Sequence, residues 1–152
     1  MTDLKKLQQC EKEMQSLLSS HDHFISNLSN FCALLKSNFD YLWVGFYLFE
    51  ENHKHLYLGP FQGPLACTQI PIGKGVCGTS FAQNKTLNIA NVHEFEGHIA
   101  CSSLSNSELV IPLRKNKKTI GILDIDSTQL NYFSLLEEEY IEKYMLILES
   151  VI

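Results

Sequence analysis

The 152-residue sequence predicts an α+β fold in which a central antiparallel sheet is covered by helices. Apolar residues recur at three- and four-residue steps near both ends of the chain, which indicates amphipathic helices. Between them lie short runs rich in aromatic and β-branched residues, which indicate strands. We expect one domain over residues 1–152, with N-terminal helices (1–39), a sheet with its site loops (40–133) and a C-terminal helix (134–152).

The composition excludes several classes of protein. Hydrophobic residues make up 45% of the chain and charged residues 19%, which is typical of a globular protein. A net charge of -5 disfavours nucleic-acid and anionic-lipid partners, because both require a basic surface. The N-terminus lacks the apolar region of a secretory signal, and no apolar run approaches the ~18 residues that a membrane helix needs. We therefore expect a cytoplasmic protein that binds neither nucleic acid nor membrane.

The chain has five cysteines, an odd number that argues against a structural disulfide framework in a reducing compartment. Any disulfide should be transient and either catalytic or sensory. Cys10 and Cys32 lie on the apolar stripes of helices predicted over about residues 3–19 and up to Ser37, so both should be buried. The other three cysteines lie near glycine-rich turns or on a loop: Cys67, Cys77 and Cys101.

The first predicted strand, residues 41–49, has two different faces. Alternation places Trp43 and Tyr47 on one face and a uniformly apolar set, suited to the core, on the other. The face with Trp43 and Tyr47 is either covered by a helix or serves another purpose. A second strand is expected at residues 55–58, followed by a loop over 59–64 that is rich in chain breakers.

A glycine-rich turn at residues 73–78 opens a short helix. It lacks the spacing of a phosphate loop, so no nucleotide is expected, although its backbone N–H groups suit a carboxylate. Residues 67–70 and 86–90 on either side read as short strands.

A hairpin is predicted from residues 108–115 and 119–126. If Lys115 pairs with Thr119, one face is apolar and the other places Glu108 opposite Asp126, with Asp124 one step along. Three crowded carboxylates repel one another, which raises the pKa of at least one of them. The alternative is a solvated sheet face that simply carries acids.

The long irregular segment 91–107 is typical of a lid or binding loop. It carries Cys101 close to His98. A redox-active thiol needs exposure, deprotonation and a second thiol that resolves its oxidised form. A carboxylic acid that stays protonated could supply the proton that an oxygen leaving group, such as a sulfoxide oxygen, requires. The pattern therefore predicts a thiol redox site that faces an acidic pocket.

A zinc site is the rival interpretation. Cys67, Cys77, Cys101 and His98 are suitable ligand types. Because no Cys-x-x-Cys or His-x-x-x-His pair is present, the spacing argues against zinc, and we expect no metal.

Seven motifs resemble those of the free methionine-R-sulfoxide reductases, a family of single GAF domains. They are Trp-Val-Gly-Phe-Tyr (43–47), Gly-Pro-Phe-Gln-Gly (59–63), Ala-Cys-Thr (66–68), Gly-Lys-Gly-Val-Cys-Gly (73–78), Gly-His-Ile-Ala-Cys (97–101), Ser-Glu-Leu-Val-Ile-Pro-Leu (107–113) and Gly-Ile-Leu-Asp-Ile-Asp-Ser (121–127). Most GAF domains lack the three cysteines, so the resemblance is specific.

The resemblance implies a role for each candidate residue. Cys101 would attack the sulfoxide sulfur and become a sulfenic acid as methionine leaves, Cys67 would resolve it as a disulfide, and Cys77 would be an auxiliary thiol. The remaining positions would form the substrate site: Trp43 and Tyr47 for the methyl end, and Glu108, Asp124 and Asp126 for binding and activating the sulfoxide.

The resemblance also implies that no cofactor is bound. Reducing equivalents would come from a thioredoxin-like partner, and thus indirectly from NADPH. The preference for the free amino acid and for the R epimer also rests on the resemblance, which allows for a homodimer as well. The chain departs from the family where an aspartate usually follows the nucleophile, since Ser102 occupies that position.

The alternative function is a GAF-type sensor of a small ligand or of oxidants, without turnover. A sensor is usually joined to an output domain, for which this chain has no room, so its length favours the enzyme.

Overall fold

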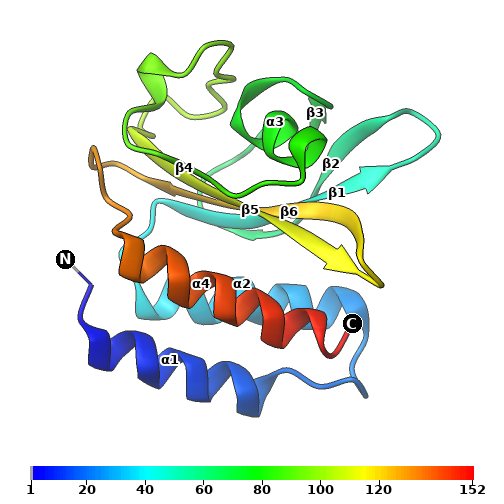
Figure 1. Ribbon diagram of the computed structural model, residues 1–152, viewed down its shortest axis with the longest axis vertical. Coiled ribbons are helices and arrows are strands. Elements are labelled where there is room, and N and C mark those ends of the chain that lie inside the picture. The colour runs from blue at the N-terminus through cyan, green and yellow to red at the C-terminus, as the bar shows by residue number, and fades with distance from the viewer. Residues whose placement is uncertain (1) are drawn as a thin grey trace.

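The computed structural model describes residues 2–152 and contains one six-stranded antiparallel sheet in the order β3-β2-β1-β6-β5-β4. Helices α1, α2 and α4 cover one face, while α3 and a long loop cover the other (Figure 1). The elements are α1 (Leu4–Leu17), α2 (Phe24–Asn38), β1 (Trp43–Glu50), β2 (His55–Gln62), β3 (Gln69–Pro71), α3 (Gly75–Gln83), β4 (Leu87–Ile89), the 3-10 helix η1 (Val92–Glu94), β5 (Ser107–Lys115), β6 (Lys118–Ser127) and α4 (Leu135–Glu149). The predicted α+β class, with helices over an antiparallel sheet, is confirmed.

The main core lies between the sheet and the three helices α1, α2 and α4. Val44, Phe46 and Leu48 of β1 point into it, as the alternation along this strand predicts. Cys10 and Cys32 are fully buried in the same core, which confirms that both thiols serve packing.

The opposite face of the sheet carries a smaller apolar cluster. Trp43 and Tyr47 belong to it together with Val76 and Cys77 of α3. The helix therefore covers part of this face, and the remaining part opens into the pocket described below. The other face is covered by α2 and α4, on which α1 packs, so the pocket lined by Trp43 and Tyr47 lies on this second face.

The prediction of a loop over residues 59–64 is wrong for its first four residues, because β2 continues to Gln62. The register shifts along β1: Gly45 pairs with Phe61, whereas Tyr47 pairs with Leu58. One extra residue of β2 is accommodated there as a β-bulge. Bulges tolerate proline and glycine inside a strand, and this explains why Gly59 and Pro60 do not end β2.

The hairpin of β5 and β6 also contains an irregularity that the sequence reasoning missed. Lys115 pairs with Lys118 rather than Thr119, across a two-residue turn whose residues, Asn116 and Lys117, both have positive φ. One extra residue of β6 then restores the predicted register. Glu108 consequently lies opposite Asp126, as expected.

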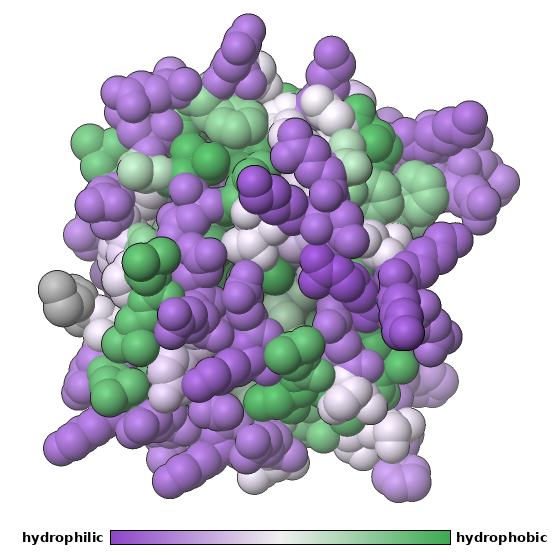
Figure 2. All heavy atoms as spheres, viewed as in Figure 1, coloured by the Kyte–Doolittle hydropathy of each residue, from purple (hydrophilic) through white to green (hydrophobic). Residues whose placement is uncertain are grey.

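The face shown in Figure 2 is mostly hydrophilic, and its hydrophobic residues form separate patches. Single exposed leucines of this kind are normal on soluble domains and identify no docking surface. None of the helices within residues 2–152 combines the length and the apolar character needed to cross a membrane.

Candidate active site

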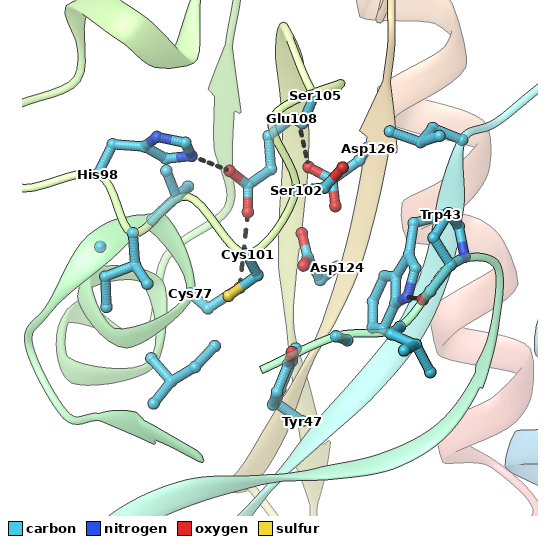
Figure 3. A pocket seen from close by; sticks show the side chains of 18 of the residues that line it. Trp43, Tyr47, Cys77, His98, Cys101, Ser102, Ser105, Glu108, Asp124 and Asp126 are labelled. Carbon is cyan, nitrogen blue, oxygen red and sulfur yellow. Dashed lines mark hydrogen bonds and ion pairs between the residues drawn. The ribbon is translucent and has the colours of Figure 1, made fainter. Parts of the chain in front are cut away.

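A pocket lies on the second face of the sheet, between β1, β6, α3 and the segment 98–105 (Figure 3). Seven of the eight residues singled out from the sequence line it: Trp43, Tyr47, Cys77, Cys101, Glu108, Asp124 and Asp126. The eighth, Cys67, is covalently attached to one of the seven. The sheet and one loop thus bring together residues that are up to 83 positions apart, from Trp43 to Asp126.

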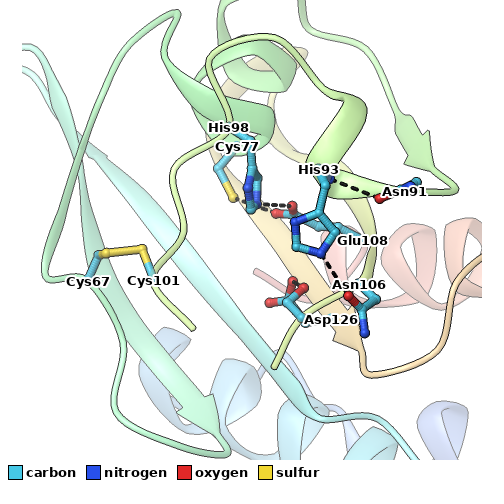
Figure 4. Close-up of polar contacts among 10 residues, drawn as sticks. Cys67, Cys77, Asn91, His93, His98, Cys101, Asn106, Glu108 and Asp126 are labelled. Carbon is cyan, nitrogen blue, oxygen red and sulfur yellow. Dashed lines mark hydrogen bonds and ion pairs between the residues drawn. A yellow bond between two sulfur atoms is a disulfide. The ribbon is translucent and has the colours of Figure 1, made fainter. Parts of the chain in front are cut away.

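Cys67 and Cys101 form a disulfide, and their Cα atoms are 5.4 Å apart (Figure 4). The sequence and the family resemblance left the resting disulfide open between Cys67–Cys101 and Cys77–Cys101. In the structure Cys77 is free and buried, while both bonded cysteines are half-buried. The bond lies at the rim of the pocket and is partly exposed to solvent.

The two aromatic residues of β1 hold the segment that carries Cys67. Tyr47 Oη donates a hydrogen bond of 2.8 Å to the carbonyl oxygen of Cys67, and Trp43 Nε1 donates one of 3.1 Å to that of Pro64. The indole also stacks between Tyr47 and Phe61, with ring centroids 5.8 and 5.3 Å away. Gly45 makes this possible, because a Cβ there would lie 2.5 Å from the indole ring.

Glu108 and Asp124 are buried, and Asp126 is partly exposed. Burial, and then the charge of Asp126, raises the pKa of Glu108 to about 8. Burial and the charge of Glu108 raise the pKa of Asp124 well above its usual range, and burial together with Asp124 does the same for Asp126. Near pH 7 the cluster therefore keeps protons that isolated carboxyl groups would have lost.

Two contacts orient the acids. Ser105 Oγ donates a 2.7 Å hydrogen bond to Asp126 Oδ1, and Cys77 Sγ donates one of 3.6 Å to Glu108 Oε1. Burial, followed by the charges of the surrounding acids, raises the pKa of the Cys77 thiol well above its usual value. A neutral thiol is a poor nucleophile, so in this arrangement Cys77 acts as a hydrogen-bond donor.

Asp124 Oδ1 is buried and has no hydrogen-bond partner within residues 2–152. Its side chain lies between those of Cys77 and Asp126, facing the pocket (Figure 3). A buried polar atom without a partner is costly, which indicates that this atom is satisfied by a polar ligand in the pocket.

The zinc ligands considered from the sequence are not available together. The sulfur atoms of Cys67 and Cys101 are bonded to each other, and the third cysteine lies among carboxyl groups instead. Potential ligand atoms of Cys77, Glu108 and Asp124 lie within 4.8 Å of one another. Because the pKa values of all three are raised, a metal ion would have to displace protons from these groups near neutral pH.

The pocket is also lined by residues that the sequence-based site did not include, and three of them are polar residues of the loop that carries Cys101. His98 lies with Nε2 3.8 Å from Glu108 Oε2, and Ser105 binds Asp126. Their position within a few residues of Cys101 was the only available signal. Ser102, at the position that departs from the family, also lines the pocket, and its Oγ accepts a hydrogen bond from the backbone N–H of Leu104.

Comparison with known proteins agrees with this geometry. The model of the GAF domain family matches residues 23–149. A free methionine-R-sulfoxide reductase of Escherichia coli is 44% identical over 93% of this chain and 85% of its own length. A free methionine-R-sulfoxide reductase of Neisseria meningitidis, solved with its substrate, superposes with a TM-score of 0.91 at 40% identity over 99% of this chain and 92% of its own. The reduced form of fRMsr of Staphylococcus aureus also superposes with a TM-score of 0.91, at 46% identity over 95% of this chain and 94% of its own.

The fold and the site together define a GAF domain whose pocket combines a disulfide-forming cysteine pair with buried carboxyl groups. Within that class, the chain belongs to the free methionine-R-sulfoxide reductase family. The resemblance found in the sequence is therefore confirmed.

Proposed function

We propose that this protein reduces free L-methionine-(R)-S-oxide to L-methionine. The observation that carries the proposal is the Cys67–Cys101 disulfide at the rim of a pocket lined by carboxyl groups with raised pKa values. The family supports the choice of substrate, since one of the solved relatives holds its substrate and is named for this reaction.

In the reduced protein, the Cys101 thiolate attacks the sulfoxide sulfur while a protonated carboxyl group of the cluster gives its proton to the sulfoxide oxygen. The oxygen passes to Cys101 as a sulfenic acid, the sulfoxide sulfur gains two electrons, and methionine leaves. The Cys67 thiolate then attacks Cys101 Sγ, and the hydroxyl group leaves as water with a second proton. The product is the disulfide observed here.

The residues around the pocket suit the two ends of the substrate. The apolar faces of Trp43 and Tyr47 accommodate the methyl group on the sulfur. Asp124, whose Oδ1 lacks a partner, faces the position of a polar group. The thiols supply both electrons, so the reaction requires neither a bound cofactor nor a metal.

A thioredoxin-like protein then reduces the half-buried disulfide and draws its electrons indirectly from NADPH. This recycling requires a reducing compartment, which supports a cytoplasmic location. Because the chain belongs to a family of single-domain reductases, catalytic turnover is favoured over the alternative function of a GAF sensor without turnover.

The test is consumption of NADPH in the presence of thioredoxin and thioredoxin reductase when L-methionine-(R)-S-oxide is added. The wild-type protein should consume NADPH in proportion to the methionine formed, whereas a sensor would consume none. Cys101→Ser should abolish turnover, because no thiolate remains to attack. Cys10→Ala, which removes a buried thiol far from the pocket, is the matched control and should retain activity. Full activity of Cys101→Ser would contradict the assignment of the nucleophile.

A further inference from the structure

The carboxyl cluster needs a path along which protons return to it. This need follows from the proposed reductase reaction, in which both cysteines react as thiolates and two protons are therefore taken up for every disulfide formed. The cluster is enclosed by β5, β6 and α3, and Glu108 and Asp124 are almost inaccessible to solvent. A proton given up by Glu108 or Asp124 must therefore be replaced through a side chain that contacts these two buried acids and also reaches water, which leaves the partly exposed Asp126 within the cluster and a neighbour outside it.

His98 has the required position. Its Nε2 lies 3.8 Å from Glu108 Oε2, and 16% of its side chain is exposed, compared with 7% for that of Glu108. Figures 3 and 4 both show the imidazole pointing at the Glu108 carboxyl group from the loop that carries Cys101. The ring therefore forms a bridge between the solvent side of the loop and the acid.

The other contacts of the cluster do not provide such a path. Asp126 is held by the Ser105 hydroxyl, which does not titrate near neutral pH, and the Cys77 thiol is itself buried. The free oxygen of Asp124 faces the pocket, which the substrate fills during the reaction. Among the titratable side chains that contact the cluster within residues 2–152, His98 therefore has the access to water that the relay needs.

The charges around His98 favour transfer in the required direction. The groups that face it are Glu108 on β5, Cys77 on α3 and His93 beside η1, with Asp124 and Asp126 of β6 behind Glu108 and Lys74 at the start of α3. Burial, and then the charge of His93, lowers the pKa of His98, whereas that of Glu108 is raised to about 8. A proton on the imidazole is therefore held less tightly than one on the carboxyl group, so it moves to Glu108.

We propose that His98 relays protons from solvent to Glu108 during turnover. Once Glu108 is deprotonated, an acid in solution protonates Nδ1 of the ring, and Nε2–H passes its proton to Glu108 Oε2 through one bridging water, since the 3.8 Å separation exceeds hydrogen-bond distance. Proton exchange with solvent then returns the ring to the Nε2–H tautomer. The step moves one proton and no electrons, and two such steps restore the two protons consumed. His98 acts through Glu108 and is therefore a positioning residue rather than a catalytic one.

The test follows methionine release by reduced His98→Ala under saturating reductant, with and without added imidazole. We expect the first equivalent of methionine at close to the wild-type rate, because the acids are already protonated. Later turnovers should be about tenfold slower, at the lower end of what proton transfer contributes to enzyme rates. Imidazole should restore the later turnovers, because it can carry protons in place of the missing ring.

His21→Ala is the control, since His21 is exposed in the connection between α1 and α2 and does not line the pocket. It should show neither the slowing nor the response to imidazole. His98→Gln fills the space without titrating, and should behave as His98→Ala does if removal of the ring leaves the loop in place.

The proposal is overturned if later turnovers of both His98 variants match the wild type. It is equally overturned if the first turnover slows as much as the later ones and imidazole has no effect, because that result indicates a structural role. A wild-type protein that releases no methionine would instead contradict the proposed function itself.

Discussion

At the scale of single residues, Trp43 and Tyr47 have two tasks where the sequence predicted one. Their ring faces line the pocket, as expected for a site that holds a methyl group. Their polar ends donate hydrogen bonds to the segment of residues 64–67 and so position Cys67 beside the loop that carries Cys101. The same two side chains thus link the substrate pocket to the thiol that resolves the oxidised nucleophile.

The Cys67→Ser variant tests whether Cys101 is the attacking thiol and Cys67 the resolving one. We expect one equivalent of methionine from the reduced variant, because Cys101 remains able to attack, and then little recycling by thioredoxin, because no disulfide with residue 67 can form. Mass spectrometry after one equivalent of L-methionine-(R)-S-oxide should find a Cys67–Cys101 bond in the wild type and a sulfenic acid in the variant. Normal cycling of the variant would identify another resolving thiol, and Cys77 would then be the candidate.

At the scale of elements, a buried hydrogen bond fixes α4 to the chain that enters β1. Tyr41 Oη donates to Glu137 Oε1 at 2.6 Å, and both side chains are buried. Burial, the largest effect, raises the pKa of Glu137 and of Tyr41. The first turn of α4 carries two acids, Glu137 and Glu138, which suit the positive end of the helix dipole, and Glu137 turns inward to Tyr41.

The Tyr41→Phe variant removes the donor and leaves a buried carboxyl group without its partner. We expect a loss of about 1–3 kcal/mol in the free energy of unfolding, measured in urea. Tyr57→Phe, at an exposed position of β2, should change stability by no more than about 0.5 kcal/mol. Equal stability of the two variants would show that the buried bond contributes nothing net.

At the scale of the whole molecule, the two faces of the sheet have different roles in stability and in the reaction. Its helix-covered face supplies the apolar core, and its other face holds carboxyl groups in protonated form at a cost. Because the pKa of Glu108 is about 8 in the folded protein and lower when unfolded, the folded protein binds more protons between these values. Stability contributed by this proton is present at low pH and is lost as the pH rises through about 8.

We therefore expect the urea concentration at the unfolding midpoint of the disulfide form to decrease as the pH is raised from 6.5 to 8. The lowered pKa of His98 has little effect in this range. The urea midpoint of Glu108→Gln should decrease less steeply with pH, since an amide has no proton to lose. Glu94→Gln, at an exposed position of the loop, should keep the wild-type slope. Identical slopes for all three proteins would contradict the raised pKa of Glu108.

The sequence by itself determined the α+β class, the two faces of β1, the burial of Cys10 and Cys32, and the placement of Glu108 opposite Asp126. These features follow from side-chain periodicity, which is a local property of a helix or strand. The tertiary structure alone decided the bulges in β2 and β6, the contact of His98 with Glu108, and the inward turn of Glu137 towards Tyr41. Such contacts depend on how loops close and on which distant groups share a buried space, and the local pattern of residues does not specify either.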